Sequence, residues 1–368
     1  MQRRAFPRAF VCGRDTVTEP PIKLGLVGLG YWGPTLLRAL FDLPAVEVLW
    51  ICDLDAERLE RYGRRYPSAS RTRRIDDILA DDRVDAVVIA TPVFTHYYLA
   101  SRALEAGKHT FVEKPLAGSA SEADDLVRMA ADRDLVLMCG HTFVYSPAVR
   151  AVKGILDREE LGQIFFVSSS RVNLGLHQRD ISVISDLGPH DFSILLYWFG
   201  EMPSSVRAVG RDSVVPGVPD VAFVTLTFPS GLIANVELSW LAPSKLRRTV
   251  VVGSEKMVVY DDGATEPIRL FDHGVIYQDP ETFGEYQLSY RTGDIVSPRI
   301  DNDEPVALEL GDFTEMVRTG AAPDWHVELA RNVAHLTEAA EESLGNGGAE
   351  VTPSGRRHRF TPEKVHDQ

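Results

Sequence analysis

The chain has 368 residues, of which 44% are hydrophobic, and this length favours two domains over one. Acidic side chains number 53 against 39 basic ones, and the formal net charge of −14 disfavours binding to a nucleic acid backbone. The apolar runs are far shorter than the roughly 20 residues that a membrane-spanning helix needs. We therefore expect neither a nucleic acid nor a membrane as a partner.

The segment 1–21 is rich in arginine but lacks the apolar stretch of a secretory signal. Pro7, Gly13 and Pro20 interrupt it, so that it fits no amphipathic helix. An Arg-rich organelle presequence has a similar composition. We favour the other interpretation, a disordered extension that precedes the folded part of the chain.

Residues 22–143 alternate between strand-like apolar runs and segments with helical spacing. The expected strands lie at 22–27, 46–52, 84–90, 109–112 and 135–139. This alternation predicts an α/β domain in which helices cover a parallel sheet. Cys52 and Cys139 lie in two of these strands and show no metal-ligand spacing. We expect no bound metal and a reducing, cytoplasmic compartment.

Closely spaced glycines connect the first expected strand to the first expected helix. Gly28, Gly30 and Gly33 form G-x-G-x-x-G, in which the first glycine permits a tight turn and the second lets backbone approach a pyrophosphate. The N-terminus of the following helix attracts phosphate. The next strand ends at Asp53, where a carboxylate binds the adenosine ribose hydroxyls and repels a 2′-phosphate. The pattern predicts a Rossmann domain that binds NAD(H) at least about tenfold more tightly than NADP(H).

Polar residues also follow the next two expected strands, at the edge where open α/β sheets bind ligands. Thr91, Pro92 and His96 follow the third strand, in the run ATPVFTH. Glu113 and Lys114 follow the fourth, in the run EKP. Taken alone, Lys114 fits an ordinary surface lysine. Its place between a buried strand and a proline leaves it little freedom to swing into bulk water, which favours a role in a site.

The sequence pattern changes after the first domain. One helical segment leads into period-two stretches rich in β-branched residues between 163 and 261, which predict an α+β domain with an open, mostly antiparallel sheet. Two helical segments near 305–319 and 325–344 close this domain, which we place at 144–345. These helices can pack back on the first domain. Residues 346–368 are polar and interrupted by glycine, so we expect a tail with little fixed structure.

A histidine and an aspartate lie four residues apart in the second domain. If Ser185 or Asp186 caps a helix here, Asp186 and His190 face the same side of it. A histidine with a carboxylate one turn away can act as a general acid or base. A capping aspartate next to a structural histidine gives the same spacing, so spacing alone leaves both interpretations open.

These motifs together resemble the Gfo/Idh/MocA oxidoreductases. The resemblance rests on GLGYWG, an acidic end to the second strand, ATP-x-x-x-H, EKP and D-x-x-x-H, and it extends over about residues 22–345. The YWGP variant is similar to the branch of WlbA/WbpB-type nucleotide-sugar 3-dehydrogenases. Many relatives carry a Gly-rich run before the aspartate, whereas Val183, Ile184 and Ser185 stand here. This departure leaves the substrate open.

The resemblance implies hydride transfer between NAD and a secondary alcohol carbon, C3 in this branch, of a sugar or nucleotide sugar. Lys114, Asp186 and His190 match the catalytic positions. His190 would take the hydroxyl proton, Asp186 would orient His190, and Lys114 would bind the same oxygen. The expected cofactor contacts are Gly28, Gly30, Tyr31, Trp32, Gly33, Asp53, Thr91, Pro92, His96, Glu113 and Lys114.

The second domain would form one wall of the site and hold the subunits together, so we expect a homodimer or homotetramer. Candidate substrate contacts are Arg171 and Asn173, followed by Tyr145 and Lys245. Arg171 pairing with a carboxylate on the sheet is an equally good interpretation.

Two other functions fit the same fold. One is a ketosugar reductase in deoxysugar or natural-product biosynthesis, and Asp53 argues against the NADPH that such an enzyme would use. The other is a non-catalytic protein that senses NAD or a sugar. Intact Lys114, Asp186 and His190 argue against this sensor, because a sensor does not need them.

Overall fold

The computed structural model describes residues 20–175, 181–278 and 287–355. The disordered extension predicted for 1–21 lies almost entirely outside these ranges. In the described part of the chain, no helix combines the length and the apolar character that crossing a bilayer requires.

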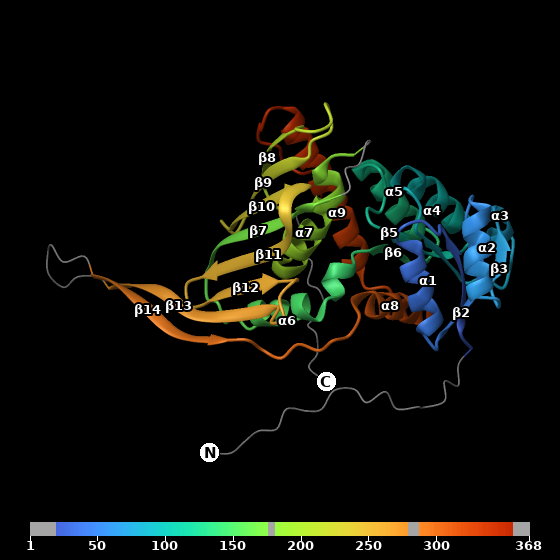
Figure 1. Cartoon of the computed structure of the whole chain (residues 1–368), viewed down its shortest axis with the longest axis horizontal. Helices are drawn as coiled ribbons and strands as arrows, with labels where there is room; N and C mark the ends of the chain where they lie inside the picture. The colour runs from blue at the N-terminus through green and yellow to red at the C-terminus, as the bar shows by residue number, and fades with distance from the viewer. Residues whose placement is uncertain (1–19, 176–180, 279–286, 356–368) are drawn as a thin grey trace, which may run out of the picture.

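The first half of the chain forms a six-stranded parallel sheet with the order β3-β2-β1-β4-β5-β6 (Figure 1). Its strands are β1 (Ile22–Val27), β2 (Val46–Cys52), β3 (Ser70–Thr72), β4 (Ala86–Ile89), β5 (His109–Glu113) and β6 (Leu137–Gly140). This order, with helices in the crossovers, confirms the Rossmann prediction. β3 was not predicted, because three residues are too short to show a period.

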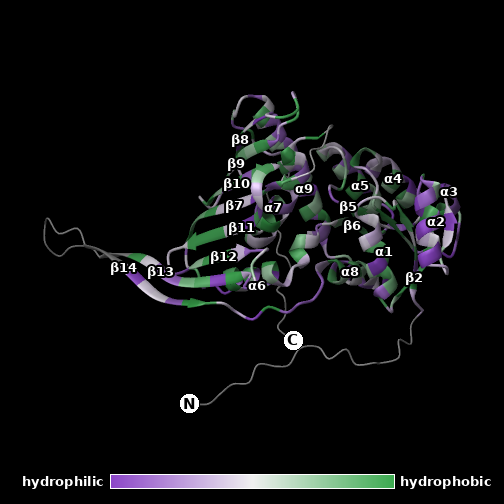
Figure 2. Ribbon diagram, in the orientation of Figure 1, coloured by the Kyte–Doolittle hydropathy of each residue, from purple (hydrophilic) through white to green (hydrophobic). Residues whose placement is uncertain are grey.

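Helices cover both faces of this sheet. They are α1 (Gly33–Asp42), α2 (Ala56–Arg65), α3 (Ile75–Leu79), α4 (His96–Glu105) and α5 (Ala120–Ala131), with a short 3₁₀ turn η1 (Val93–Thr95) before α4. Local residues start two of them, since the side chain of Asp55 caps α2 and that of Ser119 caps α5. Figure 2 shows that hydrophilic residues gather on α2 and α3, at the outer end of the sheet.

The second half forms an eight-stranded sheet with the order β14-β13-β12-β11-β7-β10-β9-β8. Its strands are β7 (Ile164–Leu174), β8 (Ser205–Arg211), β9 (Val221–Thr227), β10 (Ile233–Ser239), β11 (Leu241–Gly253), β12 (Met257–Asp261), β13 (Ile268–Gln278) and β14 (Gln287–Val296). Among the described strands of this sheet, only β7 and β10 pair in parallel, so the predicted mostly antiparallel sheet is confirmed. β13 and β14 form an arm that projects from the body (Figure 1), and the sequence did not predict it.

The remaining helices lie between the two sheets. They are η2 (Thr142–Tyr145), α6 (Pro147–Asp157), α7 (Val183–Phe199), α8 (Pro305–Thr319) and α9 (Asp324–Gly345). α7 packs on β7, β9 and β10, whereas α8 packs on α1 and α9 on α5, so the last two helices return to the first sheet. Asp124 of α5 forms an ion pair with Arg331 and lies 3.1 Å from Nε2 of His335, both on α9.

Part of the tail has fixed contacts, contrary to expectation. Val351 pairs with Val206 of β8, and the Ser354 hydroxyl lies 2.8 Å from Nδ1 of His335. β8 is an edge strand, and its free backbone groups bind a passing segment whatever the polarity of that segment. Residues 356–368 of the predicted tail lie outside the described residues.

Candidate active site

The glycine turn after β1 is shaped to hold a phosphate-bearing cofactor. Gly28 has a φ of +99°, which only glycine adopts easily, and a Cβ on Gly33 would lie 2.0 Å from the carbonyl oxygen of Gly28. A Cβ on Gly30 would meet only Nη1 of Arg58, at 3.9 Å. The backbone at Gly30 is therefore open to a pyrophosphate, as the motif predicts. Tyr31 and Trp32 lie exposed on the same turn.

Asp53 lies beside this turn, as predicted for a residue that binds the ribose. Its Oδ2 accepts a hydrogen bond from the backbone N–H of Leu29 at 2.6 Å, and its Oδ1 accepts one from Asp55 at 2.8 Å. These bonds fix the carboxylate against the glycine turn. The glycine turn, the N-terminus of α1 and Asp53 would together hold NAD. The bound NAD would supply a hydride acceptor at this edge of the sheet.

His96 has a different position from the one expected. Its ring is buried, with Nδ1 2.7 Å from the carbonyl oxygen of Pro115 and Nε2 2.8 Å from that of Thr91. His96 therefore connects the segments that follow β4 and β5, and both its ring nitrogens lie within hydrogen-bond distance of backbone oxygens. Thr91 lies against the glycine turn, close to where a Cβ on Gly28 would stand, while Pro92 is exposed.

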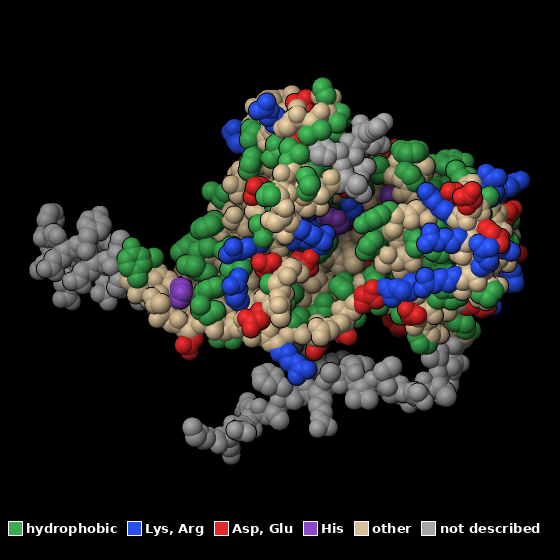
Figure 3. All heavy atoms as spheres, viewed as in Figure 1, with side chains coloured by type: hydrophobic (Ala, Val, Ile, Leu, Met, Phe, Trp, Pro, Cys, Tyr) green, Lys and Arg blue, Asp and Glu red, His purple; other side chains and the backbone are tan. Residues whose placement is uncertain are grey.

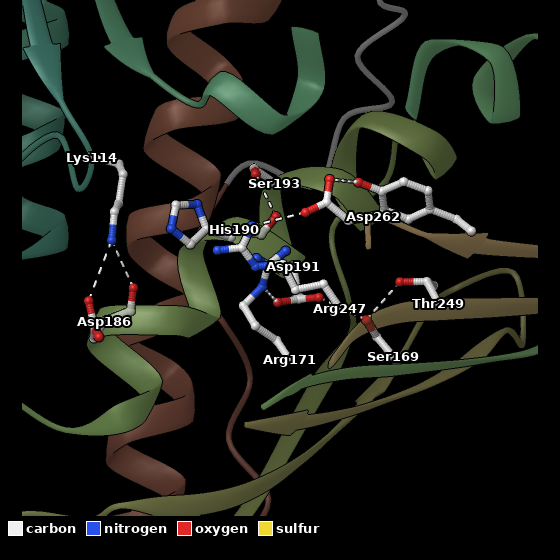
Figure 4. A network of polar contacts seen from close by, with 11 residues as sticks. Lys114, Ser169, Arg171, Asp186, His190, Asp191, Ser193, Arg247, Thr249 and Asp262 are labelled. Carbon is white, nitrogen blue, oxygen red and sulfur yellow. Dashed lines mark hydrogen bonds and ion pairs between the residues drawn. The ribbon is translucent and has the colours of Figure 1, made fainter. Parts of the chain in front are cut away.

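Lys114 reaches from the end of β5 to the start of α7 (Figure 4). Its Nζ donates a hydrogen bond to the backbone oxygen of Asp186 at 2.9 Å and lies 3.6 Å from Oδ1 of the same residue. The Lys114–Pro115 peptide bond is cis. Burial raises the pKa of the neighbouring Glu113 to about 7, and its Oε1 is buried with no hydrogen-bond partner among the described residues. Such an unpaired oxygen can bind a ligand.

α7 begins three or four residues earlier than the predicted caps, Ser185 or Asp186, imply. The Ser182 hydroxyl accepts hydrogen bonds from the backbone N–H groups of Ile184 and Ser185, so Ser182 is the cap and Asp186 lies inside the first turn. Trp240 donates a hydrogen bond from Nε1 to Oδ2 of Asp186 at 3.1 Å. The Asp186 carboxylate thus lies between an indole N–H and the Lys114 ammonium group.

His190 lies one turn after Asp186, with its ring edge against Phe143 at a centroid distance of 5.0 Å. Burial lowers the pKa of His190 well below its usual value, and the positive charges of Lys114 and Arg171 lower it further. A neutral imidazole can accept a proton near pH 7. No hydrogen bond or ion pair joins Asp186 to His190 among the described residues, so the expectation that Asp186 orients His190 is wrong: this carboxylate holds Lys114 instead.

Arg171 is not free to bind a substrate. It forms an ion pair with Asp191, and both side chains are almost fully buried. The Ser169 hydroxyl donates to Oδ1 of Asp191 at 2.8 Å and lies 2.8 Å from the hydroxyl of Thr249. The structure thus bears out the second interpretation of Arg171, a pair with a carboxylate. This network fixes α7 on the sheet directly after His190.

The other three predicted substrate contacts differ in their burial and in their hydrogen-bond partners. Tyr145 is buried and donates to Oδ2 of Asp312 at 2.6 Å, so it is not available to a substrate. Lys245 is exposed, and within the described ranges no hydrogen bond or ion pair joins it to the group around Lys114. Asn173 has a buried Oδ1 with no partner in the described part of the chain, and it stays a candidate.

Sequence reasoning missed two residues of this site. Nη1 of Arg247 donates to Oδ2 of Asp262 at 2.9 Å, and its guanidinium lies 5.3 Å from the centroid of Phe143. His141 directly follows β6, and both its ring nitrogens are buried without a partner among the described residues. Burial lowers the pKa of His141 to about 3. The position of His141 after a parallel strand was a usable signal, whereas nothing local marked Arg247.

The space-filling view shows a hollow between the two halves of the molecule, with histidine and basic side chains visible inside it (Figure 3). The ends of β1 and β5 lie at one edge of the parallel sheet, so the glycine turn and Lys114 face the same region. An alcohol in this region has an ammonium group and a neutral imidazole within reach. The imidazole can accept the hydroxyl proton while a hydride leaves the carbon, and the ammonium group can stabilise the negative charge that develops on the oxygen.

Comparisons with known proteins identify the family of the chain. Residues 22–141 match the model of an oxidoreductase family with an NAD-binding Rossmann fold, and residues 149–259 match the GFO/IDH/MocA C-terminal domain. A UDP-N-acetylglucosamine 3-dehydrogenase from Acidithiobacillus ferrooxidans is 31% identical over 246 residues, or 65% of this chain and 74% of that protein. A D-apiose dehydrogenase from Paraburkholderia graminis is 28% identical over 71% of this chain and 70% of its own length.

A solved structure extends the likeness to almost the whole chain. GenD2 from gentamicin A biosynthesis, in complex with NAD, has a TM-score of 0.78 and 25% identity, covering 95% of this chain and 99% of its own. Both halves of the chain, the cofactor turn and the relatives therefore point to one family. The chain belongs to the Gfo/Idh/MocA family and is an NAD-dependent dehydrogenase that acts on a CH–OH group.

Proposed function

We propose that the enzyme oxidises a secondary hydroxyl of a nucleotide sugar, at C3, with NAD as hydride acceptor. The observation that carries this proposal is that Lys114 and His190, which are far apart in sequence, lie near each other (Figure 4), close enough for the charge of Lys114 to lower the pKa of His190. The substrate and the carbon are supported by the named activity of the Acidithiobacillus relative. The coarser statement, that the enzyme is an NAD-dependent sugar oxidoreductase, follows from the family.

In the proposed reaction each residue has one task. His190, kept neutral by burial and by nearby positive charge, accepts the hydroxyl proton on an imidazole nitrogen. Lys114 donates a hydrogen bond to the same oxygen and stabilises its developing negative charge. Asp186 holds the Lys114 ammonium group in place, and Trp240 holds Asp186. NAD, when bound, supplies the hydride acceptor.

A neutral His190 can accept the hydroxyl proton at the start of the oxidative reaction, because a base must be unprotonated before it can take a proton. The alternative is a ketosugar reductase of the same fold, in which the same imidazole would first have to be protonated. No observation in the site favours that direction.

A panel of substrates tests the proposal. The purified enzyme is mixed with NAD and with free sugars, nucleotide sugars and cyclic polyols, and NADH formation is followed by absorbance. We expect turnover with a nucleotide sugar, and a product that is a 3-keto sugar by NMR. Turnover limited to free sugars, or oxidation at another carbon, would contradict the nucleotide-sugar C3 assignment while leaving the dehydrogenase class intact.

A further inference from the structure

Several exposed arginines lie on α2, on β3 and directly after β3, the elements that follow or pair with the strand ending before Asp53. Basic side chains gather over the end of the molecule formed by α2 and α3, although the chain as a whole carries a net charge of −14 (Figure 3). They belong to Arg58, Arg61, Arg64, Arg65, Arg71, Arg73 and Arg74. Two of them, Arg58 and Arg73, contact the segment that carries Asp53.

Arg58 lies between Asp53 and the glycine turn. Its Nη1 is 3.8 Å from Oδ2 of Asp53, and its Nε is 3.4 Å from Oδ2 of Asp55. The same Nη1 lies 3.9 Å from the position of a Cβ on Gly30. The guanidinium group therefore borders both the ribose-binding carboxylate and the pyrophosphate turn, and half of the side chain stays exposed to a ligand.

Arg73 reaches the same place from a neighbouring strand. β2 and β3 run parallel, and the backbone N–H of Asp53 donates to the carbonyl oxygen of Thr72, so the residues after both strands meet at one edge. Nε of Arg73 donates a hydrogen bond to the carbonyl oxygen of Leu54 at 3.0 Å. Its guanidinium group therefore lies beside the residue that follows Asp53.

Side chains of both charges meet at this corner. Asp53 and Asp55 supply two carboxylates, and Arg58 and Arg73 supply two guanidinium groups. Both oxygens of Asp53 accept backbone hydrogen bonds, so its carboxylate is held in place and cannot turn away from a phosphate. Guanidinium groups bind phosphate through charge-assisted, often bidentate hydrogen bonds. A 2′-phosphate here would meet repulsion from Asp53 and attraction from both arginines.

We propose that Arg58 and Arg73 form an anion site for the 2′-phosphate of NADP(H), so that the preference for NAD(H) depends on the Asp53 carboxylate alone. The proposal concerns the cofactor only and is independent of which sugar is the substrate. It predicts that the parent enzyme binds NADPH measurably, about tenfold more weakly than NADH.

Binding measurements on the full-length protein test the proposal without a substrate. NADH and NADPH are titrated by fluorescence, and 2′,5′-ADP and 5′-ADP by calorimetry. In Arg58→Ala, and separately in Arg73→Ala, we expect the ratio of NADPH to NADH dissociation constants to rise at least about tenfold, as expected for loss of a hydrogen bond to a charged group. Arg64→Ala removes an equal charge from the same helix, where Arg64 contacts Glu60, and should leave the ratio unchanged.

Asp53→Asn should move the ratio in the opposite direction, by at least about tenfold, because it removes the charge that repels the phosphate. The substitution also changes an acceptor of two backbone hydrogen bonds, so loss of NADH binding in this variant would mean a damaged turn and leave the test to the arginine variants. The proposal is overturned if the NADPH to NADH ratio in both arginine variants equals that of the parent, or if 2′,5′-ADP binds no more weakly to them.

Discussion

At the residue scale, the site depends on two side chains whose environments differ. Lys114 is held by Asp186, and His190 is held by packing against Phe143 and by its place on α7. A structural role and a catalytic role for these two residues predict different effects of substitution on turnover and on melting temperature. The difference can be measured on the protein, because neither residue contacts the adenosine half of the cofactor site.

We predict that Lys114→Ala and His190→Asn reduce turnover by roughly 10²- to 10⁴-fold, the usual contribution of a positioned acid or base. NADH affinity and melting temperature should stay close to those of the parent. Lys256→Ala, which removes a lysine that contacts Glu160 outside the site, is the matched control and should keep parental turnover. A lower melting temperature with an unchanged rate per folded molecule would assign the residue a structural role.

The charge on Arg247 should set part of the pH dependence. Burial is the main reason for the low pKa of His190, and the positive charge of Arg247 adds to it. Removing that charge stabilises the protonated imidazole, so Arg247→Met should raise the pKa of His190 and move the acid limb of kcat/KM to higher pH. Arg248→Met is the control, because adjacent residues of β11 point to opposite faces of the sheet. An acid limb that stays in place would show that Arg247 does not act on the base.

At the element scale, the position of α7 determines the geometry of the site, since Asp186 and His190 both lie on it. Ser182 caps its N-terminus and also donates a hydrogen bond to Glu341 of α9. The helix is thus fixed at its start by a cap and by α9, and along its length by the pair of Arg171 and Asp191.

Ser182→Ala should cost about 1 kcal/mol of stability, the usual value of a serine cap, and should also lower turnover. Ser119 caps α5, far along the chain from α7, and gives a matched control. Ser119→Ala should cost a similar amount of stability and leave turnover per folded molecule unchanged. Denaturant unfolding and single-temperature rates on both variants check this. Equal effects of the two variants on turnover would contradict the proposed role of the α7 cap.

At the scale of the whole molecule, α7 packs on the eight-stranded sheet, and the opposite face of this sheet exposes apolar side chains in the part of the chain that the structure describes. Phe166 pairs with Ile233, and Val209 pairs with Phe223, so these four side chains lie on one face, and each is about half exposed. Apolar side chains in such a row are typical of a surface that meets another subunit.

We therefore predict a homodimer or homotetramer that buries this face. Light scattering should give a multiple of the 40.8 kDa chain mass at micromolar concentration. The double variant Phe166→Glu, Ile233→Lys should shift the protein toward the monomer, because a charge in an apolar interface loses its hydration. Thr225→Glu adds a charge on the same face, between the two apolar pairs, without removing an apolar side chain, and should weaken association less. A parent protein that stays monomeric would refute the assembly.

The nucleotide-binding turn and the parallel sheet could be predicted from the sequence, because both depend on residues that are close together in the chain. Gly28 is required because its φ is positive, and Gly33 is required because its backbone lies too close to Gly28 for a side chain. The spacing of these glycines was therefore enough to predict the nucleotide-binding turn. The alternation of buried strands with helices identified the Rossmann sheet in the same way. β13 escaped prediction because Asp272, His273 and Gly274 break its alternation, and β3 because it is short.

The contacts that define the site were decided by the tertiary structure. The four-residue spacing predicted that Asp186 lies near His190. Only the fold brought Lys114 and Trp240, which are 72 and 54 residues away in sequence, to Asp186. Arg58 reached Asp53 through the packing of α2, not through a motif. Periodicity reports which face of an element is buried, because that depends on neighbours within a turn or two. Which charged group meets which depends on how elements pack, and this was fixed only when the two sheets and α7 came together.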